Sequence, residues 1–361
     1  MALTNFAALT DEQKTVWSLD FWRQARNLSF LNKYTGTGTN SIVQRITDLK
    51  KSEKGARAVI TLIADLEGDG VVGDNTLEGN EEALSSYDQV IQIDQMRHGN
   101  QHKGRMADQK SVVTFRTESK DKLAYWMADR LDQLAFLTAS GVSYAYNTDG
   151  TLRVGSQFPN LAFAADVTAP STNRHFRWDA ASGLVAGDTS QVVAADTPTY
   201  KMIVDMKAVA KEHFVRGVDT GGDDEGYHLF LTPTAFARLR MDPDFMANQR
   251  HAGARGPNSE LFKGTSSVVC DGVMVHEFRH VFHSATWGGG AVAGCRGLFC
   301  GAQALGLADI GAAYWEEDGF DYKNRQGISI GKIAGLLKPK FYAKKTGTTE
   351  DFGVFALDMA Q

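Results

Sequence analysis

One stretch of the sequence, from residue 57 to residue 97, constrains the fold more than any other. Its two ends, 57–66 and 88–97, alternate apolar and polar residues with the period of two that is typical of a strand. The segment between them is rich in glycine, and no lysine or arginine lies between Arg57 and Arg97. The pattern therefore predicts a long hairpin with an acidic tip, whose acids are Asp65, Glu67, Asp69, Asp74, Glu78, Glu81, Glu82 and Asp88.

Basic residues flank this predicted hairpin on both sides. They are Lys50, Lys51, Lys54 and Arg57 before it, and Arg97, Lys103, Arg105 and Lys110 after it. A hairpin with an acidic tip and a basic root is complementary to a second copy of itself, because the tip of one copy can meet the root of the next. Such a contact joins unlike surfaces and closes copies into rings. The alternative is a solvated acidic loop without a partner.

A helix rich in aromatic side chains is predicted before the hairpin, over residues 10–33. Thr10 and Gln13 form a capping box at its start. A Thr/Gly-rich run, 35–39, follows it, so this helix has to dock on another surface. It packs either on its own domain or, as an arm, on a neighbouring copy. The contact residues we expect are Trp17, Phe21 and Trp22.

The strongest helical pattern in the chain covers residues 118–140. Apolar residues recur there at intervals of three and four, which places them on one face of a helix. Gly141 follows at a position where helices commonly end. At about 1.5 Å per residue this helix is long enough to form a backbone for the molecule. Its predicted core residues are Leu123, Trp126, Leu131 and Leu134.

The rest of the chain mixes strands with inserted helices. Residues 142–198 predict short strands and loops, and helices are predicted after Pro198 and after Thr232 and Pro233. Strands are predicted at 227–231, 267–282, 296–308 and 327–343. A hairpin, a long helix and strands with inserted helices together indicate the α+β class.

Composition and the lack of targeting signals exclude several classes of protein. The formal net charge of -5 argues against a protein whose main task is to neutralise nucleic-acid phosphates. Cys270, Cys295 and Cys300 include no CxxC pair, which indicates free thiols in a reducing compartment. Residues 1–14 show no signal-peptide pattern, and no apolar run reaches the roughly 18 residues of a membrane span. We therefore expect a cytoplasmic protein without a membrane partner, unless it leaves the cell by lysis.

Residues 276–280, with the sequence HEFRH, match a zinc-binding pattern. On a helix, two such histidines bind zinc and the glutamate acts as a general base, as in a metallopeptidase. Here the flanking residues are apolar and β-branched, which favours a strand. On a strand His276 and His280 would lie roughly 13 Å apart, too far for one ion. A strand with surface histidines is the favoured interpretation, and the zinc metallopeptidase is the alternative.

Other site patterns are incomplete. The run from Asp65 to Gly70 begins like a calcium-binding EF-hand loop, but position twelve is Thr76, so the bidentate glutamate is missing. Dinucleotide-binding, P-loop and nucleophile-elbow motifs are absent from the sequence. We therefore assign no catalytic, cofactor-binding or metal-binding residue, and no cofactor.

Several segments, taken in order, match blocks of one known protein family. The most specific is 73–84, GDNTLEGNEEAL, followed by 90–97, VIQIDQMR. Weaker matches are the helix with Trp126, Arg130, Asp132 and Gln133, and the block Leu231, Thr232 and Pro233 with Phe236, Leu239 and Arg240. Over roughly residues 15–335 the chain resembles the major capsid protein family of N-four-like tailed bacteriophages.

The resemblance implies a Hong Kong 97-type phage capsid fold, which is α+β. Its parts would be an N-terminal arm at 1–50, an extended E-loop hairpin at 51–112, and a peripheral domain at 113–195 with a spine helix at about 118–140. An axial domain would cover 196–335, and a C-terminal strand at 336–361 would return to the peripheral domain. The intersubunit contact residues implied on the E-loop are Asp74, Glu78, Glu81, Glu82 and Arg97.

The implied function is that of a major capsid protein, a structural protein and not an enzyme. It would assemble with itself, as pentamers and hexamers, into the icosahedral shell around the double-stranded DNA genome, without sequence-specific DNA binding. The other implied partners are a portal protein and a separate scaffolding protein, or none, with a decoration protein left open. The chain would be part of the virion, assembled in the bacterial cytoplasm. A tail or other virion structural protein is a further alternative.

Overall fold

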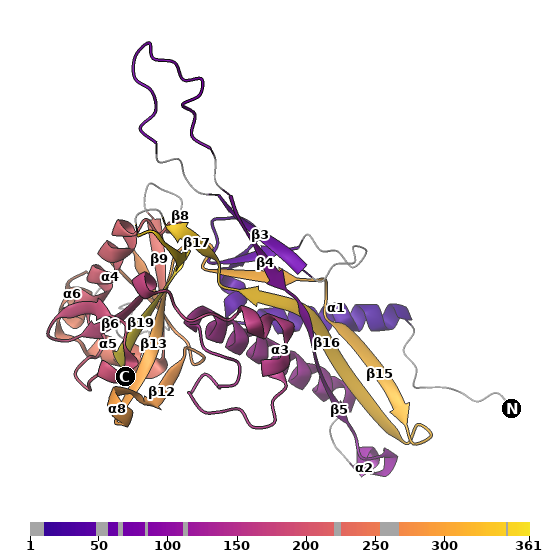
Figure 1. The fold of residues 1–361 in the computed structure, drawn as a ribbon. Coiled ribbons are helices and arrows are strands. Elements are labelled where there is room, and N and C mark those ends of the chain that lie inside the picture. The colour runs from indigo at the N-terminus through magenta and orange to yellow at the C-terminus, as the bar shows by residue number, and fades with distance from the viewer. Residues whose placement is uncertain are drawn as a thin grey trace.

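The molecule has two parts and a projecting hairpin (Figure 1). The computed structural model describes residues 11–47, 57–63, 68–83, 86–110, 115–219, 225–252, 267–343 and 346–361. A rounded lobe carries α4 (Tyr200–Glu212), α5 (Pro233–Met241) and α6 (Pro243–Ala252), and an elongated part carries α1 (Asp11–Leu28) and α3 (Phe115–Ser140). Within the described ranges, no helix is both long and apolar enough to cross a membrane.

The elongated part is a six-stranded sheet with two helices packed on it. The strand order is β1 (Thr35–Gly36), β2 (Val43–Ile46), β14 (Leu305–Asp309), β16 (Arg325–Leu337) and β15 (Tyr314–Phe320), and β5 (Asp94–Gln101) also pairs with β16. Helix α1 contacts α3 and β15, and α3 contacts β16. The core between these elements contains Phe21, Leu123, Met127, Trp315 and Ile330.

Helix α3 is the long helix predicted at 118–140, and it begins three residues earlier, at Phe115. It ends where Gly141 takes a φ of +67°, and the Val142 N–H donates to the Leu137 carbonyl at 3.0 Å. This left-handed closure satisfies a carbonyl of the last turn. A Cβ at Gly141 would lie 2.5 Å from the Thr168 carbonyl oxygen. Both the backbone angle and the available space therefore require glycine.

The lobe is built around a nine-stranded sheet. Its order is β10 (Ser267–Cys270), β11 (Val273–Glu277), β9 (Glu225–Leu231), β13 (Val292–Cys300), β19 (Val354–Ala360), β6 (His175–Asp179) and β7 (Gly183–Ala186), with β12 (His283–Thr286) on β13 and β8 (Val218–Asp219) on β9. The predicted helices are confirmed as α4, capped by Thr199, and α5, capped by Thr232 with Pro233 in its first turn. Met206 and Phe236 from these helices pack in one core with Phe299 and Phe355 of the sheet.

The remaining elements are short. They are β3 (Arg57–Ile63), β4 (Ser86–Gln92), α2 (Arg105–Lys110), α8 (Trp287–Gly290), β17 (Lys340–Ala343), β18 (Thr348–Asp351) and the 3₁₀ turns η1 (Leu31–Tyr34), η2 (Phe158–Asn160), η3 (Ala162–Asp166), η4 (Thr172–Arg174) and η5 (Thr189–Gln191). The mixture of sheets and helices is the α+β architecture that the sequence predicts.

The returning half of the predicted hairpin is not one strand. Residues 88–97 divide at Ile93: β4 pairs with β3, whereas β5 pairs with β16 of the six-stranded sheet. At this point the Gln92 N–H donates to the Asp166 carboxylate at 3.2 Å, outside the ladder, and the chain changes its pairing partner. The hairpin is therefore shorter than predicted, and its return strand continues into the body of the protein.

Two other strand placements differ from the predicted division of the chain. We expected the segment 336–361 to return to the part that contains the long helix, but β19 lies between β13 and β6 in the lobe. All seven residues of β19 are buried, as is typical of a central strand covered on both faces. The strands β14, β15 and β16, expected within 196–335 as part of the lobe, instead form the sheet under the long helix, and β6 and β7 join the lobe.

The three cysteines are free, as predicted, and all three are buried. Burial raises the pKa of Cys270 to about 11 and those of Cys295 and Cys300 to about 12. The thiols are therefore protonated at neutral pH and unreactive.

Candidate intersubunit surfaces

The hairpin formed by β3 and β4 is buried on one face and exposed on the other. Residues of β3 alternate strictly between exposed and buried. The inward face carries Ala58, Ile60 and Ile91, which pack with Ile46, Ala308 and Leu337 of the six-stranded sheet. The outward face carries Val59, directly opposite Val90, and Ile63. Their exposed fractions are 49%, 44% and 62%, so the hairpin presents an uncovered apolar face.

Side chains of β4 fix the root of the hairpin to the body. The Gln89 side chain donates to the Lys340 carbonyl and accepts from the Lys340 N–H at 3.0 Å. The Gln92 side chain donates to Asp166 at 3.3 Å. These contacts hold the orientation of the strands, while the distal loop extends away from the body (Figure 1).

The tip of the hairpin, residues 68–83, is an exposed loop organised partly by its own acids. The Glu81 carboxylate accepts from the Gly79 N–H at 2.7 Å, and the Glu82 carboxylate accepts from the Gly68 N–H at 2.6 Å. Asp74 and Glu78 are exposed, like Glu81 and Glu82. Two of the five acids in this loop, Glu81 and Glu82, therefore shape it through backbone hydrogen bonds. Residues 64–67, which include Asp65 and Glu67 of the EF-hand-like run, lie outside the described residues.

Two apolar side chains stand out in this acidic tip. Val72 is 79% exposed and Leu77 is 58% exposed. Arg97, the basic contact residue implied at the root, lies exposed on β5 opposite Gly331 of β16. The structure thus places acids and exposed aliphatic side chains at the distal end and an exposed arginine on the sheet.

The aromatic residues of α1 pack on their own chain. Phe21 is fully buried, 6.2 Å from Trp315 between ring centroids. Trp22 is buried beneath the Lys332 ammonium, which lies 4.1 Å from its ring centroid. Phe21 and Trp22 therefore dock on their own domain, which is the first of the two alternatives given by the sequence. The side chain of Trp17 lies outside the described residues.

The long helix supplies both apolar packing and a polar anchor. Leu123 and Leu134 are buried, and Trp126 and Leu131 are half-buried. Asp132, also buried, accepts hydrogen bonds at the end of α1 from the Ser29 hydroxyl at 2.7 Å and the N–H groups of Phe30 and Leu31 at 2.8 and 3.3 Å. Burial raises the pKa of the Asp132 carboxyl, although these hydrogen bonds oppose the effect.

The HEFRH segment begins on β11, so the predicted strand is confirmed as far as Glu277. The strand ends there, and His280 lies in the turn that follows, not on the strand as predicted. The prediction of surface histidines is wrong, because His276 and His280 are only 6% and 8% exposed. The His276 ring contacts the Tyr34 hydroxyl at 3.1 Å and the His228 ring at 2.9 Å. The sequence did not indicate this burial, because the ring is covered by η1, whose position depends on long-range packing.

His280 belongs to a different cluster from His276. Its Nε2 lies 2.7 Å from the Asp129 carboxylate on α3, which also accepts from Arg279 at 2.8 Å. Burial alone would raise the pKa of Asp129, but the His280 hydrogen bond and the nearby cations hold it below its usual value. Among the described residues, no three histidine, cysteine or acidic side chains are grouped to hold a metal. The two histidines therefore attach β11 to two other elements and do not converge on a site.

Burial lowers the pKa of both His228 and His276 to about 4. For His276 the neighbouring His228 and Lys33 lower it further. The two rings are stacked, 5.1 Å apart. At neutral pH this pair is therefore uncharged and can share a single hydrogen bond.

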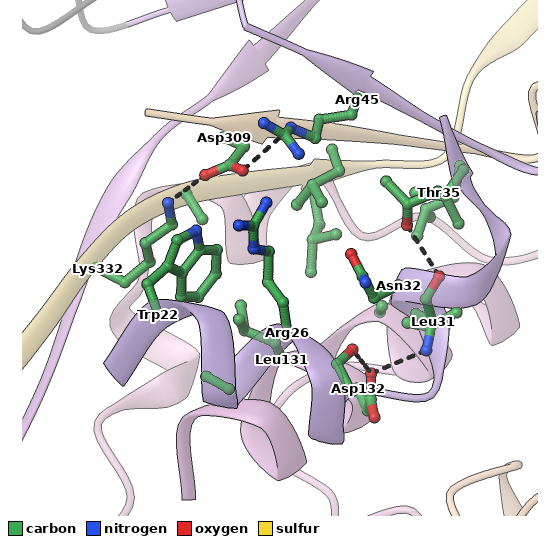
Figure 2. A pocket seen from close by; sticks show the side chains of 18 residues that line it. Trp22, Arg26, Leu31, Asn32, Thr35, Arg45, Leu131, Asp132, Asp309 and Lys332 are labelled. Atoms are coloured by element: carbon green, nitrogen blue, oxygen red, sulfur yellow. Dashed lines mark hydrogen bonds and ion pairs between the residues drawn. The ribbon is translucent and has the colours of Figure 1, made fainter. Parts of the chain in front are cut away.

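A pocket lies between α1 and the six-stranded sheet (Figure 2). Its volume is about 60 Å³, and most of its wall is aliphatic. Charged side chains also reach it: Lys332 and Arg45 bind the Asp309 carboxylate, Arg45 at 3.2 Å, and Figure 2 shows Arg26 extending from α1 toward the sheet. Sequence reasoning missed this pocket because its walls come from elements far apart in the chain.

Ion pairs are buried where the lobe meets its neighbouring loops. Arg174 and Glu350 are each 1% exposed and 3.0 Å apart, and Lys338 and Asp351 are 2.9 Å apart. Burial lowers the pKa of Arg174, whereas the carboxylates of Glu350 and Asp351 oppose that shift. Such pairs are costly to break because a single buried charge would remain.

Comparison with known proteins supports one family. The family model described as phage capsid protein matches residues 5–361. The chain is 59% identical to the major capsid protein of Pseudomonas phage KPP25 over 99% of its own length and 97% of that protein.

Solved structures are similar over almost the same extent. The capsid of Ralstonia phage GP4 matches with a TM-score of 0.76 and 25% identity, over 92% of this chain and 91% of that one. The capsid asymmetric unit of cyanophage Pam1 matches with a TM-score of 0.70 and 20% identity, over 100% of this chain and 96% of that one.

Proposed function

Because the chain belongs to the phage capsid protein family, we propose that its projecting hairpin joins neighbouring copies in the shell. The chain is the major capsid protein of a tailed phage, a structural component of the virion that forms the icosahedral shell and has no enzymatic role. Its fold is of the Hong Kong 97 type. The observation that carries the proposal is the uncovered apolar face of the hairpin, formed by Val59, Val90 and Ile63.

An apolar face of this kind favours a protein partner. A two-stranded hairpin is only marginally stable in water unless a further surface covers it. The tip adds a negative charge, carried by Asp74, Glu78, Glu81 and Glu82, which complements basic residues such as Arg97 on a second copy. The acidic tip and the basic residues lie on different surfaces of the chain, so the contact between copies is heterologous. Repeated contacts of this kind close into the pentamers and hexamers of a shell.

The division into domains follows the two sheets. On this proposal the peripheral domain comprises α1, α3 and the six-stranded sheet, with α3 as the spine helix. The axial domain comprises the nine-stranded sheet with α4, α5 and α6. The C-terminal strand β19 then belongs to the axial domain. This assignment is supported by the strand pairing and replaces the sequence boundaries of 113–195, 196–335 and 336–361.

The finer lineage and the other partners are also part of the proposal. The block 73–84 supports a place among the N-four-like tailed phages. Within the particle the chain meets a portal protein at one vertex and double-stranded DNA on its inner surface, without sequence-specific contacts. A net charge of -5 suits a wall that must not retain the genome. For assembly the proposal keeps two possibilities, a separate scaffolding protein or none, and it leaves a decoration protein open.

The test is assembly of the purified protein, followed by negative-stain electron microscopy and light scattering. We expect closed shells from the unmodified chain. Val59→Asp places a charge on the apolar face and should reduce shell yield at least tenfold, with the thermal midpoint of the unassembled chain unchanged. The matched control is Val154→Asp, at a residue that is 95% exposed on a different loop.

Equal shell yields for the two variants would contradict a role for the hairpin face. The charge component is tested separately with Glu78→Gln across a salt series, where the loss of yield should be largest at low salt. A chain that stays monomeric at every salt concentration would contradict assembly without a partner.

A further inference from the structure

The pocket under α1 has walls suited to an aliphatic side chain. Figure 2 places it between α1 and the strands β2, β14 and β16. Its aliphatic lining includes Val43, Leu131, Leu305, Leu307 and Leu336. Burying an aliphatic side chain against such a wall is favourable relative to leaving it exposed to water. Within the described part of the chain this pocket stays open.

The size of the pocket narrows the choice of occupant. Its volume is about 60 Å³. Pockets for drug-sized ligands measure roughly 300–1,000 Å³, and an engineered cavity of about 150 Å³ holds one benzene ring. The pocket is therefore too small for most free ligands, but it accommodates the end of a side chain such as leucine.

The charges around the pocket leave an excess of positive charge. The Asp132 carboxylate is occupied by Ser29 and two backbone N–H groups, and the Asp309 carboxylate is shared by Lys332 and Arg45. Arg26 adds a third cation, half-buried and 5.9 Å from the Trp22 ring centroid. Burial lowers the pKa of Lys332, and although Asp309 opposes this, Arg45 and Arg26 lower it further. The site thus favours an occupant that brings a negative charge.

The tip of the hairpin has the complementary composition. In residues 68–83 it carries five acids and no base, and the exposed Leu77 is adjacent to Glu78. The tip cannot enter the pocket of its own chain. The hairpin root packs beside that pocket, on Ile46 and Ala308, and the strands then carry the tip away from the body by about 3.3 Å per residue (Figure 1). An occupant with this chemistry therefore comes from another copy.

We propose that Leu77 of a second copy enters the pocket under α1, with Glu78 of that copy paired to Arg26. The inference rests on the proposed function, in which the hairpin joins copies, and it identifies the receiving site. Because the tip and the pocket are different surfaces, each copy gives one contact and receives another. Leu77 of the second copy would also contact the face of α1 that lines the pocket, so assembly would hold that helix on the sheet.

Disulfide mapping between two differently marked chains tests this contact. One chain carries Asn32→Cys, at an exposed residue of the pocket lining, and the other carries Thr76→Cys, next to Leu77. The three native cysteines are buried and give little background. After assembly of the mixture and mild oxidation, we expect a covalent heterodimer on a non-reducing gel. The matched control replaces Thr76→Cys with Val154→Cys and should give no such band.

Further variants test the chemistry of the contact. Adding Leu77→Asp to the Thr76→Cys chain should lower the cross-link yield at least fivefold, because a carboxylate is excluded from an aliphatic wall. Arg26→Glu and Glu78→Arg should each lower the yield at low salt, and combining them should restore it.

The outcomes separate this inference from the proposed function. Shells that form normally without the Asn32–Thr76 cross-link would overturn the pocket contact and leave the proposed function intact. An equally strong cross-link to Val154→Cys would overturn it as well. If the unmodified chain forms no shells, assembly without a partner is contradicted, and that result is distinct from a missing cross-link in shells that do form.

Discussion

The ring of Phe278 stacks on the ring of Phe30, with centroids 3.9 Å apart and planes inclined by 8°. Phe278 follows β11 of the lobe, whereas Phe30 follows α1 of the elongated part. Phe136 of α3 lies 5.1 Å from Phe278, between ring centroids. These three aromatic rings therefore join α1 and α3 of the elongated part to the end of β11 in the lobe.

Removing the Phe278 ring should destabilise the chain. Phe278→Ala deletes a half-buried ring and its stacking, and we expect a loss of about 2 kcal/mol in the free energy of unfolding, below the 3–5 kcal/mol of a fully buried phenylalanine. Denaturant unfolding of the unassembled chain measures it. Phe320→Ala, at a ring that is 50% exposed, is the control and should cost under about 0.5 kcal/mol. Equal losses for both variants would refute the role of the stack.

The buried His228 and His276 pair should make stability depend on pH. Burial lowers both pKa values from 6.5 to about 4. The unfolded chain then binds more protons than the folded chain between these values, so stability rises with pH. The contribution is complete above pH 6.5 and is lost as the pH falls toward 4. It should amount to about 2–3 kcal/mol per histidine.

A variant that cannot titrate isolates this effect. His276→Gln should roughly halve the pH dependence of the unfolding midpoint between pH 6.5 and 4, because His228 still titrates, whereas His251→Gln, at an exposed residue, should leave it unchanged. A pH profile for His276→Gln that matches the unmodified chain would count against the assignment.

The buried pair of Arg174 and Glu350 should be sensitive to the loss of one charge. Glu350→Gln removes the ion-pair partner of the buried Arg174 guanidinium, and we expect a loss of about 3 kcal/mol. The matched change is Asp20→Asn, which breaks an exposed pair with Arg23 and should cost under about 0.5 kcal/mol. Thermal unfolding of both variants distinguishes burial from pairing, and a small effect of Glu350→Gln would show that the guanidinium finds another partner.

Gly141 and Gly155 offer a comparison of strain with and without a clash. Both have a φ of +67°, but a Cβ at Gly141 meets the Thr168 carbonyl at 2.5 Å, whereas nothing lies within 4 Å at Gly155. Gly155→Ala should cost about 1 kcal/mol for the left-handed backbone alone. Gly141→Ala should cost at least about 2 kcal/mol more. Equal losses in denaturant unfolding would mean that the loop at Thr168 moves aside without cost.

Local signals explain which elements are predictable from the sequence. The alternation of β3 and the apolar repeat of α3 are set by residues close together in the chain, and both elements form where the patterns indicate. The caps of α5, Thr232 and Pro233, are local in the same way.

Long-range pairing explains the differences. No residue pattern near Ile93 indicates that the chain changes its pairing from β3 to β16, because this pairing depends on a strand more than 200 residues later. The apolar sequence of β19 is compatible with a buried strand in either sheet, so only its pairing with β13 and β6 determines its place. The burial of His276 depends on Tyr34, which the fold brings from the opposite end of the chain.

The candidate site shows the same division. The acidic tip can be read from sequence, as can the exposed side of β3. The aliphatic pocket cannot, since α1, β2, α3, β14 and β16 all contribute to it. The acids of the tip are therefore predictable from the sequence, whereas the pocket that we propose receives the tip is visible only in the folded chain.

The division of the return strand has a mechanical consequence. A pull on the hairpin passes along the backbone from β4 into β5, which is paired with β16 through eight consecutive residues. The load is then shared along the whole ladder and carried into β14 and β15, which pair with the same strand. A shell under internal pressure would strain such a joint as a unit, so that tension between copies is distributed through the sheet and not concentrated at the base of the hairpin.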